Sequence, residues 1–290
     1  MKKLFNSLYY RLFPYYQNWY INRFMNKSNK KSMKKKKPPI DREIVVSFTS
    51  IPSRIDYLPF MIRSIFEQTI MPDRFIMYIY RDEFSHLDLN IILKEQVELG
   101  LEIRYVDENL RSHKKYYYAK QEFPEACVIL VDDDIIYKPN MIETLIKSYQ
   151  KYPSAMSGLR GHRMKLDGKL PKPYIEWDYE YAFGTTPSHY NFLTGCGGIL
   201  LPPNLNTPLL FDKEKIRELS FSADDVWLKF IAMKEGIKVV KASLGKGTPL
   251  EIDNNPEDSL AYENVTNGNN NDISIRKMIE YYGLTFDKEY

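Results

Sequence analysis

Residues 127–140 read CVILVDDDIIYKPN, and this stretch predicts an α/β fold. Five apolar residues followed directly by three aspartates are typical of a buried strand that ends at a polar edge. Pro139 suits the first turn of a helix, which we expect to run to Lys151. Such strand–turn–helix units build parallel sheets, whose ligands lie beyond the carboxyl ends of the strands.

The same alternation of strand and helix surrounds this segment. We predict strands over 43–49, 74–80, 101–106 and 237–240, and helices over 56–68, 89–99, 114–122, 223–234 and 274–282. Asp56 and Ser222 are candidate N-caps and Gly100 a candidate C-cap, whereas residues 245–272 have the composition of a loop. We therefore expect an α/β domain with a mostly parallel sheet covered on both faces.

The charges divide the chain into two parts. Residues 1–40 contain 11 basic residues and no acidic one, whereas residues 41–290 contain 30 basic and 38 acidic residues. Within this arm, residues 4–20 place aromatic and aliphatic side chains on one side of a helix that Pro14 interrupts. We expect residues 1–37 to bind an anionic membrane surface. The alternatives are a helix packed on the body and a nucleic-acid tail, and the acidic body disfavours nucleic acid.

Composition excludes several classes of protein. A hydrophobic content of 43% can form a large core, so the body is not a disordered chain. The two cysteines, Cys127 and Cys196, form no disulfide framework, which favours a reducing compartment. The sequence has no apolar run long enough to span a bilayer and no secretory signal. We expect a cytoplasmic protein, peripheral on the inner face of the cell membrane.

The three aspartates require compensation of their charge. In extended backbone Asp132 and Asp134 point to one side and Asp133 to the other. Carboxylates this close must be protonated, paired with cations or bound to a metal, and oxygen ligands favour Mg²⁺ or Mn²⁺. The alternative is an acidic turn that caps the following helix.

VILVDDDIIYKPN (128–140) resembles the strand–DxD–helix segment of glycosyltransferases with the GT-A fold. VVSFTSIPSR (45–54), SHKKYYYA (112–119), FLTGCGGILLPP (192–203) and SADDVWLK (222–229) extend the resemblance to bacterial family-2-like glycosyltransferases of capsule or lipopolysaccharide synthesis, over residues 43–245. It implies one GT-A-like domain over 41–290 after the arm and linker of 1–40. Residues 41–150 would bind the nucleotide sugar and 151–290 the acceptor.

The resemblance also implies an activity. A sugar would move from a UDP- or GDP-sugar donor to a glycan acceptor that is linked to lipid, with Mn²⁺ or Mg²⁺ joining Asp132 and Asp134 to the diphosphate. The remaining donor-side candidates are Thr49, Ser50, Arg54, Asp82, Lys114, Lys115 and Asp133. Glu83 is an alternative to Asp82, and the two lysines are equally typical of a solvated first helical turn.

The acceptor side needs a base if the anomeric centre is inverted. The resemblance implies Asp225 for this role, with Asp224 as the alternative, although acids are ordinary in a first helical turn. Gly195, Cys196, Gly197, Gly198, His162 and Trp177 are candidate acceptor or sugar contacts. For the glycines the alternative is a tight turn, and for Cys196, His162 and Trp177 it is core packing.

Two other functions are compatible with these residues. A Mg²⁺-dependent nucleotidyltransferase also uses paired aspartates, but it would carry a glycine-rich phosphate loop after the first strand, where SFTSIPSR has no glycine. A non-catalytic membrane-associated adaptor would use the aspartates only to cap a helix.

Overall fold

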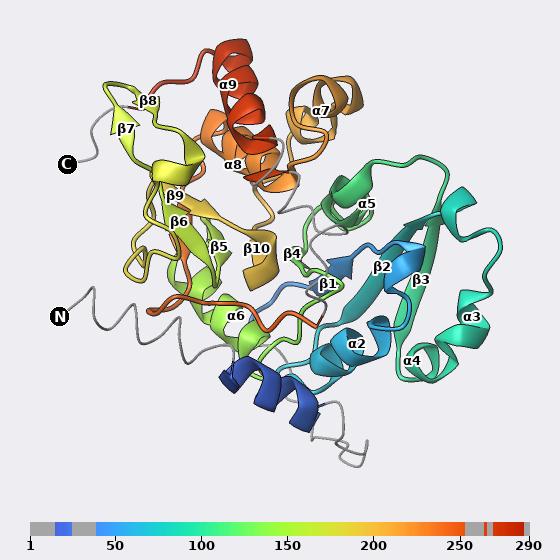
Figure 1. Cartoon of the computed structure of the whole chain (residues 1–290). Helices are drawn as coiled ribbons and strands as arrows, with labels where there is room; N and C mark the ends of the chain where they lie inside the picture. The colour runs from blue at the N-terminus through green and yellow to red at the C-terminus, as the bar shows by residue number, and fades with distance from the viewer. Residues whose placement is uncertain (1–14, 25–38, 253–263, 266–268, 287–290) are drawn as a thin grey trace.

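A seven-stranded sheet forms the centre of the protein in a computed structural model that describes residues 15–24, 39–252, 264–265 and 269–286 (Figure 1). The strand order is β11-β5-β10-β4-β1-β2-β3. The predictions for residues 1–14, including the Pro14 interruption, and for the lysine-rich linker 25–37 lie outside the described residues.

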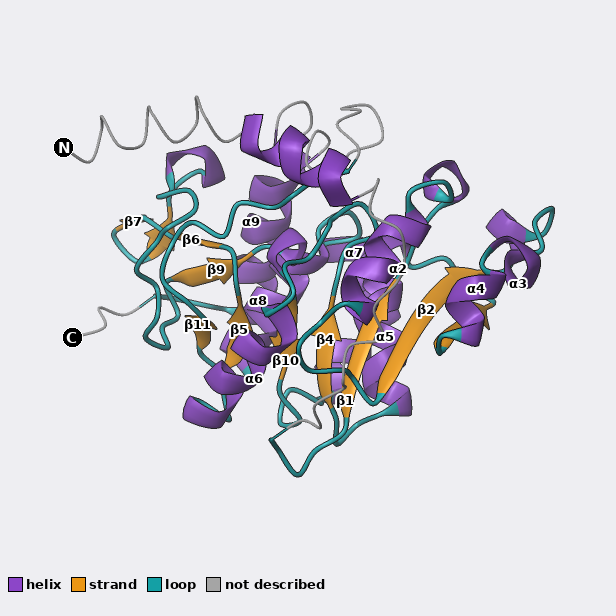
Figure 2. Cartoon of the chain, turned by 90° about the horizontal axis from the view of Figure 1, so that it is seen from below, coloured by secondary structure: helices purple, strands orange, loops and turns teal. Residues whose placement is uncertain are grey.

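The strands before residue 131 follow the predicted segments closely. They are β1 (Ile44–Phe48), β2 (Arg74–Tyr80), β3 (Leu101–Val106) and β4 (Cys127–Leu130), and they pair in parallel. The later strands are β5 (Met156–Gly158), β10 (Ile199–Leu201) and β11 (Val239–Lys241), which Figure 2 shows continuing the same row. The predicted fold class is confirmed: the protein is α/β, with a mostly parallel central sheet flanked by helices.

β10 is the exception to parallel pairing. It runs antiparallel between β4 and β5, and Ile199 at its start pairs with Leu130 at the end of β4. The residues that precede β10 therefore arrive at the edge of the sheet where the three aspartates lie. Smaller antiparallel pairs join β6 (Gly161–Arg163) to β9 (Asn191–Leu193) and β7 (Leu166–Asp167) to β8 (Leu170–Pro171).

Helices cover both faces of the sheet, as the alternation predicts. α2 (Leu58–Phe66) and α6 (Met141–Lys151) share one apolar cluster, and α5 (Lys114–Glu122) and α8 (Asp224–Lys234) share the other. α9 (Asn270–Tyr282) packs on α8 and on α7 (Lys213–Leu219), while α3 (Leu89–Ile92) and α4 (Lys94–Glu98) follow β2.

The residues of β1 pack into two apolar clusters, one on each face of the sheet. All five of its residues are buried; Ile44, Val46 and Phe48 face the cluster of α2 and α6, and Val45 faces that of α5 and α8. Alternate side chains of a strand point to opposite faces, so a strand covered on both faces carries apolar side chains on both of them.

Several predicted boundaries are wrong for local reasons. The helix expected over 89–99 is divided at Leu93 into α3 and α4, and neither Asp56 nor Ser222 is an N-cap, because Tyr57 and Ala223 hold those positions. α6 begins at Met141, because the Pro139 carbonyl accepts a hydrogen bond from Thr69 N outside the helix. α9 begins at Asn270, inside the stretch expected to be a loop.

Residues 15–24 form a helix that lies on the body, drawn in blue in Figure 1. Ile21 and Phe24 pack with Ile136 and Leu250, so this part of the arm meets the expectation of a helix packed on the body. Among the described residues, no helix combines the length and the apolar character that crossing a bilayer requires.

The buried histidine His162 predicts acid sensitivity. It is 2% exposed, and burial lowers its pKa to about 3 from 6.5. Between these values the unfolded chain binds a proton that the folded protein does not, so stability present above pH 6.5 is lost as the pH falls. We expect His162 to account for about 2 kcal/mol of the fall in unfolding free energy between pH 7 and pH 5, at about 1.4 kcal/mol per pH unit.

Urea denaturation at the two pH values measures this loss. His162→Gln keeps an acceptor for the Glu180 amide, so the difference between its two stabilities should be smaller by about 2 kcal/mol. His86→Gln, at an exposed position, should keep the full loss. Equal losses in the His162 variant and the unmodified protein would contradict the prediction.

Candidate active site

The triple aspartate lies in the turn after β4, and its central member is the most buried. Asp133 is 5% exposed and accepts hydrogen bonds from Ser50 Oγ at 2.5 Å and from Arg54 Nη1 at 2.6 Å. The same Arg54 nitrogen lies 3.1 Å from Asp134 Oδ2. Burial alone would lower the pKa of Arg54, but the carboxylates of Asp133 and Asp134 outweigh it and raise that pKa. The turn is therefore fixed to the loop that follows β1.

Lys115 connects the triple aspartate to the second acidic pair. Its Nζ lies 2.7 Å from Asp132 Oδ1 and 3.0 Å from Asp224 Oδ2, and the residue is 4% exposed. Burial opposes the charge of Lys115, yet the surrounding aspartates raise its pKa well above the ordinary value. Ser112 Oγ donates to the other Asp224 oxygen at 2.9 Å. One buried ammonium thus holds together the ends of β4 and α8.

The two acids of α8 have opposite environments. Burial favours the neutral form of Asp224, but Lys115 and the other donors outweigh it and lower its pKa. Burial, followed by the charge of Asp224, raises the pKa of Asp225 to about 8. Gly195 N donates to Asp225 Oδ2 at 3.0 Å, and the buried Oδ1 has no hydrogen-bond partner in the described part of the chain. Asp225 therefore binds a proton more tightly than an ordinary carboxyl group, whereas Asp224 is held as a carboxylate.

The oxygen donors and the excess of negative charge fit a divalent cation. Four carboxyl groups, those of Asp132, Asp133, Asp134 and Asp224, form ion pairs with only two cations, Arg54 and Lys115, and the carboxyl group of Asp225 lies beside them. Burial, and next the charge of Asp133, raise the pKa of Asp134 to about 7. No group of three acidic, histidine or cysteine side chains in the described ranges is arranged to hold an ion alone. Mg²⁺ and Mn²⁺ sites commonly use one or two carboxylates and complete their coordination with water and substrate phosphates.

The remaining donor-side candidates lie after β1, after β2 and at the start of α5. Thr49 Oγ1 is buried and has no hydrogen-bond partner among the described residues. Asp82 is exposed and accepts from Tyr80 Oη at 2.6 Å. Lys114 is 2% exposed, and its Nζ donates to Asn109 Oδ1 at 3.1 Å and lies 3.8 Å from Glu83 Oε2. Their contacts with a nucleotide stay predictions.

Gly195 brings the two acidic groups together. A Cβ at this position would lie 3.2 Å from Asp132 Oδ2 and 3.3 Å from Lys115 Nζ. The short helix η5 (Gly195–Gly197) and Gly198 precede β10, so the antiparallel course of β10 delivers them to the end of β4. A residue with a side chain at 195 would push against the ion pair. The predicted glycine run is thus part of the site's framework, and its contact with a sugar stays a prediction.

The other acceptor-side candidates lie deeper. Burial raises the pKa of the Cys196 thiol to about 11, so the thiol is neutral. His162 and Trp177 are 2% and 3% exposed and belong to an aromatic cluster with Tyr174 and Phe192. Trp177 Nε1 donates to Lys172 O. These positions agree with the alternative of core packing that the sequence left open.

Sequence reasoning missed Ser112 and Arg160. Arg160 Nη1 donates to Thr194 Oγ1 at 2.8 Å, and its Nε donates to Glu180 Oε1 at 3.2 Å. Arg160 therefore holds the residue that precedes the glycine run. An arginine next to a glycine in a segment of short strands was the available signal, but nothing in the sequence paired it with residue 194.

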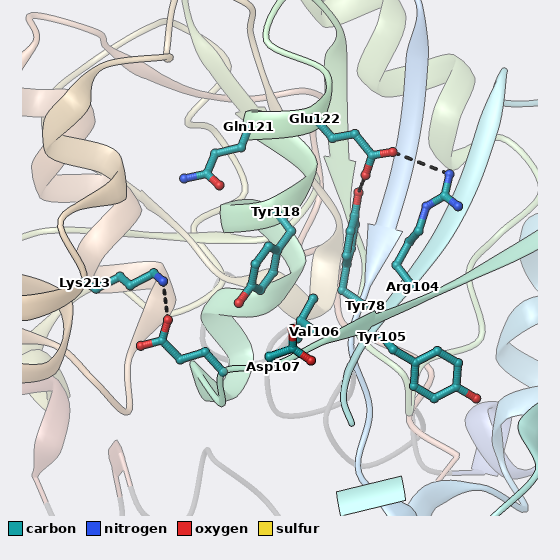
Figure 3. Close-up of a pocket in the computed structure, with 10 residues that line it drawn as sticks. Tyr78, Arg104, Tyr105, Val106, Asp107, Tyr118, Gln121, Glu122 and Lys213 are labelled. Atoms are coloured by element: carbon teal, nitrogen blue, oxygen red, sulfur yellow. Dashed lines mark hydrogen bonds and ion pairs between the residues drawn. The ribbon is translucent and has the colours of Figure 1, made fainter. Parts of the chain in front are cut away.

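A separate cavity of about 810 Å³ opens beside α5 (Figure 3). Its lining includes Tyr78, Tyr118, Glu122 and Lys213, and none of the predicted site residues. Several of these side chains already have partners, since Tyr78 Oη donates to Glu122 and Lys213 pairs with Glu108. We therefore place the candidate active site at the acidic cluster, where Arg54 and Lys115 compensate only part of the charge.

Comparison with known proteins gives similar folds at low identity. No family model and no curated protein matches the chain. A mannosyltransferase of Pyrobaculum calidifontis, solved with GDP-Man and Mn²⁺, is 12% identical over 81% of this chain and 64% of its own, with a TM-score of 0.44. The UTP-bound UGPase of Acinetobacter baumannii is 12% identical over 70% and 86% (TM-score 0.38). The 4-diphosphocytidyl-2C-methyl-D-erythritol synthase of Anaerococcus prevotii is 16% identical over 71% and 90% (TM-score 0.42).

These likenesses assign neither an activity nor a substrate to the chain, because every TM-score is below 0.5. This chain spans 64% of the mannosyltransferase's length, so the two proteins differ in extent as well as in sequence.

The ion pairs of Lys115 predict a large effect on stability. Lys115→Met keeps the side chain's length but leaves Asp132 and Asp224 without their shared cation. We expect a loss of about 3–5 kcal/mol in unfolding free energy, the usual result of removing one partner from a buried ion pair. Urea denaturation at pH 7 measures it.

Lys94→Met is the matched control. Lys94 pairs with Glu98 at 3.9 Å on an exposed surface, where such pairs contribute about 0–1 kcal/mol. If the two variants lost the same stability, Lys115 would not hold the acidic groups together.

Proposed function

We propose that this protein is a glycosyltransferase that moves a sugar from a UDP- or GDP-sugar to a glycan acceptor with inversion of the anomeric centre. The observation that carries the proposal is the meeting of two differently tuned acidic groups. Asp132 and Asp134 bring two carboxyl groups to the end of β4, and Asp225 presents beside them a buried oxygen that has no hydrogen-bond partner in the described part of the chain. The resemblance of five segments to family-2-like glycosyltransferases gives the same roles to these residues.

The donor side of the reaction needs compensation of phosphate charge. A divalent cation held by Asp132 and Asp134 would supply Lewis acidity and orientation for the diphosphate when bound. Arg54 and Ser50 hydrogen-bond to Asp133 and so hold the aspartate turn in place before the donor binds. The buried hydroxyl of Thr49, which has no hydrogen-bond partner among the described residues, is a candidate contact for the nucleotide.

The acceptor side needs a base. In the proposed step the acceptor oxygen bonds to the anomeric carbon, the bond from that carbon to the diphosphate breaks, and Asp225 takes the hydroxyl proton. The Gly195 amide orients Asp225 through Oδ2 and leaves Oδ1 for this proton. Asp224 acts through Lys115, because its oxygens are already held by Lys115 and Ser112.

The proposal also includes the two halves of the domain and the place of the reaction in the cell. Residues 41–150 hold the donor and 151–290 the acceptor, which we infer to be lipid-linked and part of capsule or lipopolysaccharide synthesis at the inner face of the cell membrane. The basic composition of residues 1–40 supports this setting, since it favours an anionic surface.

The metal role predicts a loss of donor turnover. Asp134→Asn removes a charge with little change of shape, so we expect release of nucleoside diphosphate from a panel of UDP- and GDP-sugars with Mn²⁺ to fall at least about a hundredfold, and EDTA to abolish it in the unmodified protein. Asp88→Asn should retain full activity, because Asp88 caps α3 and asparagine caps equally well.

Mass spectrometry of the products tests the reaction class. Nucleoside diphosphate and a glycosylated acceptor or free sugar support the proposal. Release of pyrophosphate from UTP, CTP or GTP with a sugar phosphate would identify a nucleotidyltransferase, and unchanged turnover in Asp134→Asn would exclude the metal role.

The two acids of α8 should differ in how their substitution by asparagine changes Tm. Asp225→Asn should lower kcat by about 10²–10⁴, the usual value of a general base. Above pH 8, where the Asp225 carboxyl is mostly ionised, the substitution should also raise Tm, by about 2–4 °C for each kcal/mol gained, because it removes a charge that burial and Asp224 disfavour. Asp224→Asn should lower Tm, because Lys115 loses a partner.

Initial rates and thermal unfolding of both variants, measured at the same pH, test this pattern. The raised pKa of Asp225 also predicts that the rate in the unmodified protein increases with pH as the carboxyl loses its proton. A fall in both Tm and rate for Asp225→Asn would assign it a structural role instead.

A further inference from the structure

The helix over residues 15–24 has one buried face and one exposed face. Ile21 and Phe24 on the inner face are each 8% exposed and pack with Ile136 and Leu250. Tyr15, Tyr16 and Trp19 on the outer face are 76%, 42% and 57% exposed. The spacing of 15, 19 and 23 is that of one side of an α-helix, and Arg23 lies with its guanidinium 5.6 Å from the Trp19 ring.

The inner face fixes the helix to the body at defined points. The Arg63 guanidinium of α2 lies 4.0 Å from the Phe24 ring and donates to the Phe24 carbonyl. Gln17 Nε2 donates to Glu251 O at 3.2 Å. With these contacts in place, the helix cannot turn Tyr15, Tyr16 and Trp19 inward.

We propose that this outer face, Tyr15, Tyr16, Trp19 and Arg23, is a docking surface for an anionic lipid bilayer. Tyrosine and tryptophan rings suit the headgroup level, where one end of the ring is apolar and the other is hydrated. The 11 basic residues of positions 1–40, with no acid among them, complement anionic headgroups.

A protein partner fits these observations less well. Ten helical residues extend only about 15 Å, whereas a stable protein interface buries about 800 Å² on each side. A bilayer needs no matching shape, because shallow insertion of a few aromatic rings and attraction of nearby cations act together.

The docking surface lies close to the acidic cluster. Residues 250–252 run between the helix and the aspartate turn, since Ile252 N donates to Asp134 O at 2.7 Å and Ile136 N donates to Leu250 O at 2.9 Å. The bilayer would therefore lie one helix and one extended segment away from Asp134. If the proposed function holds, this places a lipid-linked acceptor beside the site; the docking itself does not depend on that function.

Tryptophan fluorescence of the full chain tests the docking without any assay of activity. The three tryptophans are Trp19, Trp177 and Trp227, and the last two are 3% and 0% exposed. Vesicles of equal parts phosphatidylglycerol and phosphatidylcholine should shift the emission to the blue, and brominated lipid should quench it. Trp19→Phe should abolish both responses.

Vesicle flotation compares the variants. Joint Tyr15→Ala and Trp19→Ala substitutions should weaken vesicle binding at least about tenfold. Joint substitution of Lys34, Lys35, Lys36 and Lys37 by Gln should weaken it at least about a hundredfold. Added salt should weaken the binding of the unmodified protein to the vesicles. Ile91→Ala, at a 73% exposed residue of α3, should bind as the unmodified protein does. Circular dichroism should show each variant folded, since the substituted aromatic side chains are exposed.

Three results would overturn the docking. The first is the absence of a blue shift with anionic vesicles, and the second is equal binding to pure phosphatidylcholine. The third is a labelled single-stranded oligonucleotide that binds more tightly than the vesicles at the same salt concentration, which would assign the arm to nucleic acid.

Discussion

The buried ammonium of Lys115 is the interaction on which the rest of the site depends. It lies between Asp132 at the end of β4 and Asp224 at the start of α8, two residues 92 positions apart in the printed sequence. Without a shared cation these carboxylates would repel one another in a buried setting, where charge is costly. The two ion pairs of Lys115 therefore allow the aspartate turn after β4 and the start of α8 to lie side by side.

The reversed direction of β10 makes this meeting possible. A strand parallel to β4 would begin at the opposite edge of the sheet, far from the aspartates. Because β10 is antiparallel, its first residue pairs with the last residue of β4, and the glycine loop before it lies against Asp132 and Lys115. Gly195 then has two roles, since the lack of a side chain makes room for the ion pair and its amide orients Asp225.

The acidic cluster of the site has more carboxyl groups than cations. Arg54 and Lys115 compensate part of the acidic cluster, while Asp134 and Asp225 keep raised pKa values. Such an arrangement lowers stability, and perturbed carboxyl groups in a cluster are typical of functional sites. The helix over residues 15–24 packs on Leu250, and Ile252 hydrogen-bonds to Asp134, so the proposed bilayer surface and the proposed chemistry lie close together.

The sequence by itself determined the α/β class, the parallel strands up to Leu130 and the position of the aspartates at a strand end, because local hydrophobic patterns carry that information. It also brought Asp132 and Asp225 forward as separate candidates. Only the tertiary structure decided that Lys115 joins Asp132 to Asp224, that β10 is antiparallel to its neighbours, and that Asp224 and Asp225 differ in pKa. Those outcomes depend on contacts between residues distant along the chain, and on burial and neighbouring charge, which no local pattern specifies.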